Sequence, residues 1–428
     1  VSRYQDPAVA AFSVSLWNER LSLAVAAEVK RRFPECLVVF GGPQIPRDGT
    51  GYLEAHPFVD VTVRGEGEPV FPVLLERSLS GRDFTGVPNV CWREPGTGET
   101  VNNPESLPLQ EDLDRYPSPY LSGVFDSLLE EHPQFEFQAI IETNRGCPFG
   151  CGYCFWGKGE RFVRIRTHAL ERVKDELTWC ARKKIKYLFN ADANYGMYDR
   201  DYEIAQHLVA LKREHGYPEK FRACYTKNAE SKIFQLGSLL CENQLEKGIT
   251  LSFQSLNPEA LKNVNRHNIN LEVYRSLMAK FNSRNIPVYT ELILGLPGET
   301  YSSWLSGISQ VVRSRLNGQL FIYLCEVYPN TELSDPGFRE SKALHTVRTS
   351  LTEIHGSVRD ADGIGEEIEI IVGSYSMSLG DWKRMVAASW TTLLLLSMKL
   401  GNFVLEYLDA RLGLDPALLI EEIGRAHV

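Results

Sequence analysis

Long hydrophobic runs are missing from this sequence, and so is any excess of positive charge. The longest apolar stretch, Ser389 to Leu400, is too short and too interrupted to span a bilayer, so we expect a buried helix there. The net charge is −9, and no sustained basic run carries interleaved aromatic residues, so no nucleic-acid partner is expected. No signal-peptide pattern opens the chain. These absences favour a cytoplasmic protein without a membrane span.

A disulfide framework is absent as well. Nine cysteines in 428 residues are too few for a disulfide scaffold. In a reducing compartment, clustered thiols more often bind a metal or take part in chemistry. The composition, with 43% hydrophobic and 24% charged residues, is that of a globular protein, and the length predicts two or three domains.

The two ends of the sequence lack the features of a complete gene product. The chain begins at Val1 rather than at methionine and enters a predicted strand almost at once. Residues 423–428, IGRAHV, match an in-frame translation of a common sequencing adapter. We therefore expect a fragment, and we assign no function to residues 423–428.

Residues 1–87 alternate strand, helix and strand. Apolar segments at Ala8–Leu16 and Cys36–Pro43 flank an amphipathic helix at Arg20–Phe33, and residues 58–79 repeat the scheme. This order predicts a parallel, doubly wound, Rossmann-like sheet. Such sheets bind ligands at the carboxyl ends of their strands. Three loops are expected at that edge, namely Ser13 to Asn18, Gly41 to Pro46 and Arg64 to Glu68.

A second, longer alternation follows a proline-, glycine- and polar-rich stretch at residues 88–133, which predicts a linker. Residues 134–340 alternate strand and helix six times, two units short of an eightfold barrel. Residues 341–422 are expected to be mostly helical. The predicted fold class is α/β, with a partial doubly wound domain followed by a partial (β/α)6 TIM-like barrel and a helical C-terminal segment. The six barrel strands are expected at 137–144, 185–191, 221–227, 248–255, 286–294 and 319–327.

Three closely spaced cysteines are the strongest chemical signal. Cys147, Cys151 and Cys154 follow the first barrel strand, at the edge where barrel chemistry takes place. Iron–sulfur clusters and structural zinc sites are commonly closed by four ligands. No fourth ligand stands nearby, because Cys180 falls on the apolar face of a predicted helix. The vacancy indicates a catalytic site, with a zinc knuckle or an electron-transfer cluster as the alternatives.

The run CPFGCGYC, residues 147–154, resembles the CxxxCxxC signature of the radical S-adenosylmethionine (SAM) superfamily, whose partial barrel also has six strand–helix units. The resemblance implies that the three cysteines hold a [4Fe–4S] cluster and that SAM binds the fourth iron. One electron from the cluster then cleaves SAM, and the resulting 5′-deoxyadenosyl radical abstracts a hydrogen atom from the substrate. An electron donor such as flavodoxin or ferredoxin is the implied partner.

Polar side chains on the fourth barrel strand are consistent with this resemblance. Thr250, Ser252 and Gln254 share one strand face, which indicates either a polar ligand or cross-strand hydrogen bonds. By resemblance, Ser252 and Gln254 contact the ribose or the amino acid part of SAM. Glu291 and Tyr153 would then lie beside the adenine.

The sequence departs from the superfamily pattern after the second barrel strand. A GGE-like motif usually holds the SAM amino group there, but this chain has NADANYG at residues 190–196. Asp192 and Asn194 are the candidates to accept hydrogen bonds from the ammonium in its place.

The loops of the N-terminal sheet provide a second resemblance. FSVSLWN, VVFGGPQIP and VRGEGEPVF follow one another as in the cobalamin-binding domain that precedes many radical SAM barrels, whereas a GxGxxG dinucleotide motif is missing. The resemblance implies that these loops line cobalamin; the alternative is a set of glycine turns that only reverse the chain. The residues concerned are Ser13, Ser15, Leu16, Gly41, Gly42, Gly65, Glu66, Gly67 and Glu68.

Together the resemblances cover about residues 8–333 and imply a cobalamin-dependent radical SAM enzyme. The activity they imply is C-methylation of an unactivated or weakly nucleophilic carbon in a small-molecule or peptide substrate. One alternative is cyclisation or rearrangement of the substrate without methyl transfer. Another is a non-catalytic iron–sulfur or zinc scaffold that binds a partner protein. No motif identifies the substrate.

Overall fold

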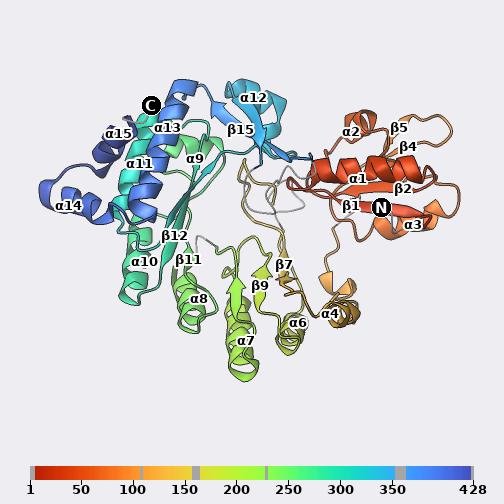
Figure 1. The fold of residues 1–428 in the computed structure, drawn as a ribbon, viewed down its shortest axis with the longest axis horizontal. Helices are drawn as coiled ribbons and strands as arrows, with labels where there is room; N and C mark the ends of the chain where they lie inside the picture. Colours follow the sequence, from red (N-terminus) through yellow and green to blue (C-terminus); the bar gives the residue numbers. More distant parts are fainter. Residues whose placement is uncertain (1–4, 107–108, 157–163, 227–229, 352–362, 426–428) are drawn as a thin grey trace.

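A five-stranded sheet forms the N-terminal lobe (Figure 1). The computed structural model describes residues 5–106, 109–156, 164–226, 230–351 and 363–425. In the N-terminal lobe the first three strands run parallel. The fourth strand pairs antiparallel with the third, and the fifth pairs antiparallel with the fourth. The strands are β1 (Val9–Ser13), β2 (Leu37–Gly41), β3 (Val61–Val63), β4 (Val90–Arg93) and β5 (Thr100–Asn102), and the helices are α1 (Glu19–Arg32), α2 (Thr50–Ala55) and α3 (Phe71–Ser78).

The sequence of strand β2 is an unbroken apolar run because the strand is packed on both faces. Val38 and Phe40 pack into the cluster that contains Ala26 and Val29 of α1, whereas Leu37 and Val39 pack into a second cluster with Leu74 of α3. Both faces of the sheet are therefore covered, which confirms the doubly wound arrangement for β1 to β3. Strands β4 and β5 lie within residues 88–133, where a linker was expected, so the first part of that stretch belongs to the sheet instead.

Six parallel strands form the second lobe, as predicted. They lie in two three-stranded sheets, ordered β10-β9-β6 and β11-β12-β13. Between and around them lie α6 (Leu170–Arg182), α7 (Asp199–His215), α8 (Glu230–Glu242), α9 (Pro258–Asn263), α10 (Leu271–Ser283) and α11 (Tyr301–Arg313). The strands are β6 (Ala139–Ile141), β9 (Tyr187–Asn190), β10 (Lys220–Arg222), β11 (Ile249–Thr250), β12 (Val288–Leu294) and β13 (Leu320–Leu324).

Alternation along β12 separates the two faces of the barrel. Val288, Leu292 and Leu294 are buried in the large core cluster formed with the surrounding helices. Glu291 and Ile293 fall on the opposite, inner face, where they are only half-buried. Cys180 of α6 is fully buried in the same large cluster, which confirms its expected place in the core.

A two-stranded ribbon stands at the mouth of the barrel. It pairs β7 (Asn144–Arg145) with β8 (Arg166–Thr167) in antiparallel orientation. Because the three cysteines lie between these strands in the sequence, the ribbon closes the base of the segment that carries them.

The C-terminal region contains two strands that the sequence analysis did not predict. β14 (His345–Ser350) and β15 (Glu367–Gly373) pair in antiparallel orientation. The rest of the described C-terminal residues are mostly helical, as expected. The helices are α12 (Pro336–Ser341), α13 (Leu379–Thr392), a π-helical turn (Leu393–Ser397), α14 (Asn402–Leu412) and α15 (Pro416–Arg425). Residues 426–428, the end of the expected adapter tail, lie outside the described residues.

The apolar stretch Ser389 to Leu400 is not the buried helix that we expected. Leu396 is buried, but Trp390, Met398 and Leu400 are each more than 60% exposed. The stretch spans the end of α13 and the π-helical turn, so its apolar residues do not share a single inward face. Among the described residues, no single helix meets the length and apolarity needed to cross a membrane; the helical pair Leu379–Ser397 and Asn402–Leu412, bent by 93°, meets these criteria only jointly.

Among the described residues, the N-terminal lobe contacts the rest of the chain in two regions. One contact is with the loop after β13 and with the C-terminal region, where the Asn330 amide donates to the Ile45 carbonyl (2.8 Å) and the backbone N–H of Arg20 donates to Glu366 (2.9 Å). The other is with the β7–β8 ribbon. A cavity of about 500 Å³ opens at the first contact, lined among others by Leu16, Glu19, Gln44, Pro46, Asn330, Arg348 and Glu369.

Candidate functional site

The cysteine segment, residues 147–154, is held in place by backbone hydrogen bonds with two neighbouring loops. The Gly152 N–H donates to the Val264 carbonyl (2.7 Å), and the Glu332 N–H donates to the Gly152 carbonyl (3.1 Å). A β-carbon at Gly152 would approach the Val264 Cα within 3.3 Å, so the loops pack closely there. Cys147 and Cys151 are buried and Cys154 is half-buried. The thiols are therefore fixed at the mouth of the barrel with little access to solvent.

Nitrogen donors approach two of the three sulfur atoms. The Asn194 side-chain amide donates to Cys147 Sγ (3.1 Å), and Arg266 Nη1 lies 3.8 Å from Cys151 Sγ. Donors and positive charge of this kind stabilise thiolates, which are the form that binds metals and clusters. Sequence reasoning missed Arg266, because a single arginine in the turn after α9 belongs to no periodic pattern.

The three thiols do not form a mononuclear metal site. Within the described part of the chain, no group of three or more His, Cys, Asp or Glu side chains is placed to hold one metal ion. A structural zinc site needs four such ligands converging at about 2.0–2.3 Å. An iron–sulfur cluster instead takes each thiolate on a separate iron, so the sulfur atoms need not converge. The donor set therefore fits a cluster better than a zinc knuckle.

Tyr153 lies in the apolar cluster beneath the cysteine segment. Its ring packs with the group that includes Val264 and Leu296, and its burial raises the pKa of the phenol, which therefore stays neutral. Tyr153 therefore anchors the cysteine segment on this apolar cluster. Its expected contact with adenine stays a prediction.

Three polar residues that were predicted to contact SAM lie together in the structure, namely Ser252, Gln254 and Glu291. The Ser252 hydroxyl donates to the Glu291 carboxylate, and the Gln254 N–H donates to the Glu291 carbonyl (2.9 Å). Gln254 has a φ of +66°, because the chain turns out of the strand direction at this residue. Arg266 also donates to the Ser252 carbonyl (3.3 Å), which ties this group to the cysteine segment. The cross-strand hydrogen bonding considered from sequence is thus present, while contact with SAM stays a prediction.

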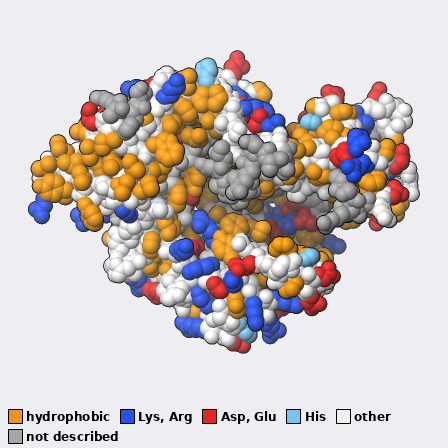
Figure 2. All heavy atoms as spheres, in the orientation of Figure 1, with side chains coloured by type: hydrophobic (Ala, Val, Ile, Leu, Met, Phe, Trp, Pro, Cys, Tyr) orange, Lys and Arg blue, Asp and Glu red, His pale blue; other side chains and the backbone are white. Residues whose placement is uncertain are grey.

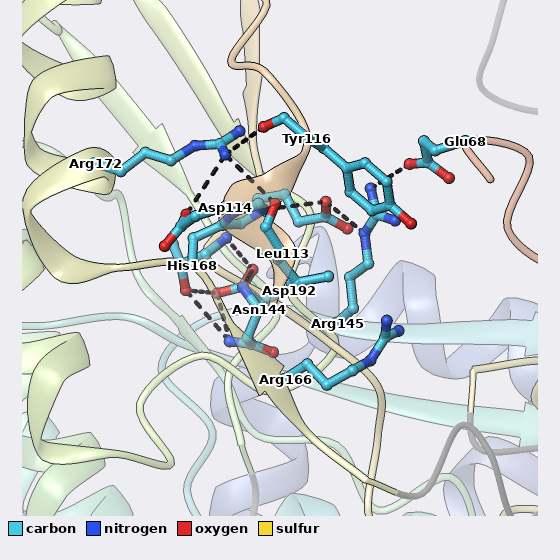
Figure 3. Close-up of polar contacts among 12 residues, drawn as sticks. Glu68, Leu113, Asp114, Tyr116, Asn144, Arg145, Arg166, His168, Arg172 and Asp192 are labelled. Atoms are coloured by element: carbon cyan, nitrogen blue, oxygen red, sulfur yellow. Dashed lines mark hydrogen bonds and ion pairs between the residues drawn. The ribbon is translucent and has the colours of Figure 1, made fainter. Parts of the chain in front are cut away.

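Asp192 accepts hydrogen bonds from within the chain, and its expected contact with the SAM ammonium stays a prediction. Its carboxylate accepts hydrogen bonds from the N–H groups of Thr143 (2.7 Å) and Asn144 (3.1 Å), from both their side chains, and from the Asn190 amide (3.2 Å) (Figure 3). The side chain is almost fully buried. Burial raises the pKa of Asp192, and the hydrogen bonds from Thr143 and Asn144 oppose that shift. Asp192 therefore fixes the start of the β7–β8 ribbon, and only Asn194 of the predicted pair reaches the cysteines.

The loops at the carboxyl edge of the N-terminal sheet pack on one another. The Ser15 N–H donates to Asn18 (2.7 Å), whose amide donates back to the Ser13 carbonyl (2.9 Å). Gly42 has a φ of +107°, and a β-carbon there would lie 2.5 Å from the Val14 carbonyl oxygen. Close backbone approach therefore explains this glycine without any ligand. Leu16, by contrast, lines the cavity between the lobes.

The RGEGE loop, residues 64–68, reaches the β7–β8 ribbon of the other lobe, which flanks the cysteine segment. Gly65 and Gly67 have open space where a β-carbon would stand. The glutamates between and after them form ion pairs instead. Glu66 pairs with Arg166 (2.5 Å), and Glu68 pairs with Arg145 (2.7 Å), as seen for the latter in Figure 3. Their expected role as cobalamin contacts stays a prediction, whereas their contact with the ribbon is a feature of the structure.

The region that carries this site is similar to a known protein family. Residues 141–306 match the family model of the radical SAM superfamily, and this range includes all three cysteines, Asn194, Ser252, Gln254, Arg266 and Glu291. The chain therefore contains a radical SAM domain, as the CxxxCxxC resemblance predicted.

Two curated relatives extend the similarity to the N-terminal lobe. The chain is 38% identical over 381 residues to the cobalamin-dependent radical SAM methyltransferase TokK of Streptomyces tokunonensis. It is 36% identical over 381 residues to the 2-(S-pantetheinyl)-carbapenam-3-carboxylate methyltransferase of Streptantibioticus cattleyicolor. Each alignment covers 88% of this chain but 55% of the relative, so the chain spans about half the length of the curated relatives it matches.

A solved structure shares the fold. The radical SAM methyltransferase TsrM from Kitasatospora setae, with cobalamin and a [4Fe–4S] cluster bound, superposes with a TM-score of 0.64 at 17% identity, covering 91% of this chain and 79% of TsrM. This similarity confirms the predicted succession of an N-terminal α/β sheet and a partial barrel.

Proposed function

We propose that this chain is the cofactor-binding part of a cobalamin-dependent radical SAM C-methyltransferase. The observation that supports this most strongly is the cysteine segment, in which two buried thiols each have a nitrogen donor beside the sulfur. It lies within a radical SAM domain, in a chain 38% and 36% identical to proteins named as methyltransferases.

Cys147, Cys151 and Cys154 would hold the [4Fe–4S] cluster. When bound, the cluster supplies one electron to SAM, and methylcobalamin supplies the methyl group. Arg266, beside Cys151 and next to the Ser252 carbonyl, is a cation suited to the carboxylate of SAM. Ser252 and Glu291, paired on the inner face, would hold hydroxyl groups of the ribose. The predicted reductant is a small electron carrier such as flavodoxin or ferredoxin.

The carboxyl edge of the N-terminal sheet would hold cobalamin. Its first loop contributes Leu16 to the cavity between the lobes, and Gln44 and Pro46 of the next loop line the same cavity. The cofactor would also occupy the open side of this edge. Loops of the sheet edge and the loop after β13 line this one cavity, an arrangement that suits two cofactors acting on one substrate.

Aromatic side chains line the inner face of the barrel and offer a surface for an uncharged part of the substrate. The rings of Tyr289 and Phe321 are 6.1 Å apart, and those of Phe321 and Tyr323 are 6.3 Å apart. Phe321 and Tyr323 are each more than one-third exposed. The substrate named for the second relative, a carbapenam carboxylate with a pantetheinyl arm, is the first compound to test.

Anaerobic reconstitution tests the proposed function. The full chain is loaded with iron, sulfide and cobalamin, given SAM, a strong reductant and the carbapenam, and analysed by mass spectrometry. We expect 5′-deoxyadenosine and S-adenosylhomocysteine from the wild type and neither from Cys151→Ala. The matched control is Cys224→Ala, an exposed cysteine outside the segment, which is expected to keep both products. An intact cluster without either product contradicts the proposal, and deoxyadenosine alone favours rearrangement over methylation.

A further inference from the structure

Two arginines stand directly opposite each other at the base of the cysteine segment. Arg145 of β7 and Arg166 of β8 are cross-strand partners in the antiparallel ribbon. Like charges in this position are destabilising unless an anion lies between them. Arg145 is only two residues before Cys147, so any separation of the ribbon would move the first cysteine.

Carboxylates from both lobes surround the two arginines: Glu142 of the same lobe (2.9 Å) and Glu68 of the other lobe (2.7 Å) pair with Arg145, and Glu66 of the other lobe bridges Arg145 and Arg166. Glu66 accepts from Arg166 through both of its oxygens (2.5 and 3.2 Å), and one of these oxygens lies 3.5 Å from Arg145 Nη1. The side chains are buried, with Arg166 2% and Glu66 13% exposed. A buried bidentate pair of this kind is costly to break from one side, because the guanidinium of Arg166 would lose its carboxylate, whereas Arg145 keeps Glu68 and Glu142.

Further hydrogen bonds hold both the β7–β8 ribbon and the loop that carries Glu66. On the ribbon side, Asp192 accepts five hydrogen bonds, four of them from Thr143 and Asn144. On the side of the N-terminal lobe, the buried guanidinium of Arg64 donates to the carbonyls of Arg47 and Asn103, and Gly65 turns the chain at a φ of +72°. The contact therefore joins two rigid supports.

We propose that Glu66 is a positioning residue for the cysteine segment: its carboxylate, carried by the N-terminal lobe, neutralises the opposed arginines and so holds the cysteines in their cluster-binding arrangement. The proposal assigns Glu66 to the protein rather than to cobalamin. The part concerning the cluster rests on the proposed function, whereas the effect on the cysteines themselves does not.

Alkylation of the cysteines tests the proposal in the full chain before any cluster is added. Glu66→Gln keeps the side-chain shape but removes the charge. We expect iodoacetamide to label Cys147 and Cys151 about tenfold faster in this variant, measured by mass spectrometry relative to the exposed Cys224. After anaerobic reconstitution, the variant should also hold less iron and give an altered electron paramagnetic resonance spectrum.

Two further variants separate positioning from general destabilisation. Glu68→Gln removes the more exposed ion pair of the same loop and is expected to change labelling by less than about twofold. Glu66→Gln combined with Arg166→Gln removes one of the opposed charges and should restore protection. If Glu66→Gln does not fold, the double variant decides: protected cysteines support the proposal and exposed cysteines overturn it.

Labelling of Glu66→Gln at the wild-type rate overturns the proposal as well. A wild-type chain that takes up no cluster contradicts the proposed function only, because the labelling result does not depend on iron. The two failures are therefore distinguishable in one set of samples.

Discussion

Single residues at the site divide into those that touch the cysteines and those that hold the loops. Asp192 and Asn194 differ by two positions in NADANYG, and sequence reasoning gave them the same role. The structure turns Asp192 inward onto Thr143 and Asn144 and brings the Asn194 amide to Cys147. Residue types and spacing could predict the cysteines, because three thiols so close together have few structural uses. The direction of a loop side chain could not be predicted, because it depends on backbone contacts with a distant strand.

Asn194→Leu should change the cluster without removing it. Leucine has nearly the same shape but no N–H, so the hydrogen bond to Cys147 Sγ is lost. N–H donors to cluster sulfurs favour the more negative, reduced state. We expect the midpoint potential to fall by on the order of tens of millivolts in a redox titration followed by electron paramagnetic resonance.

The control for this variant is Asn265→Leu, which removes an amide bonded to the Gly150 carbonyl rather than to sulfur. It should leave the potential near that of the wild type. Equal potentials in Asn194→Leu and the wild type would show that the hydrogen bond does not tune the cluster.

At the scale of helices and strands, the buried parallel elements were predictable and the antiparallel edges were not. Strands such as β2 and β12 are apolar runs or regular alternations followed by amphipathic helices, and these patterns carry their own signal. β14 has largely exposed residues, and β4 lies inside the proline-, glycine- and polar-rich stretch that predicted a linker. Such strands exist because a distant partner offers its hydrogen bonds, and local periodicity does not report that partner.

Gly42→Ala should weaken the contact between the first two loops of the sheet edge. Its positive φ and the nearby Val14 carbonyl leave no room for a β-carbon. We expect a local destabilisation of about 1–3 kcal/mol, measured as faster hydrogen exchange of the amides in β1 and β2.

Gly51→Ala is the matched substitution in the same lobe. Gly51 lies in helix α2 with open space around it, so alanine is expected to be neutral or to stabilise by up to about 1 kcal/mol. If both variants slow or both accelerate exchange to the same extent, close approach is not the reason for Gly42.

The whole molecule presents an apolar patch at the end opposite the N-terminal lobe. Figure 2 shows hydrophobic side chains gathered where α14 lies, and the structure gives Phe403 80% exposure. Large contiguous apolar patches on soluble proteins commonly mark interaction sites. We define the patch as Trp390, Leu394, Met398, Leu400, Phe403, Val404 and Tyr407.

The patch predicts that the 428-residue chain self-associates with increasing concentration. Phe403→Asp should shift sedimentation velocity profiles toward the monomer. Leu79→Asp changes a leucine that is 89% exposed in the other lobe and outside the patch, and it should leave the association unchanged. A wild type that stays monomeric at every concentration tested would contradict this prediction.

The two contacts between the lobes differ in how far water and salt reach them. At the C-terminal contact, Arg20 and Glu367 form an ion pair whose side chains are 50% and 42% exposed, whereas Arg166 and Glu66 at the ribbon are 2% and 13% exposed. Dissolved ions screen exposed charges strongly and buried ones weakly. Rising ionic strength is therefore expected to weaken the Arg20–Glu367 ion pair beside the cavity before the Arg166–Glu66 ion pair at the ribbon. The lobes would then separate first beside the cavity, while the β7–β8 ribbon that flanks the cysteines keeps its contact with the N-terminal lobe.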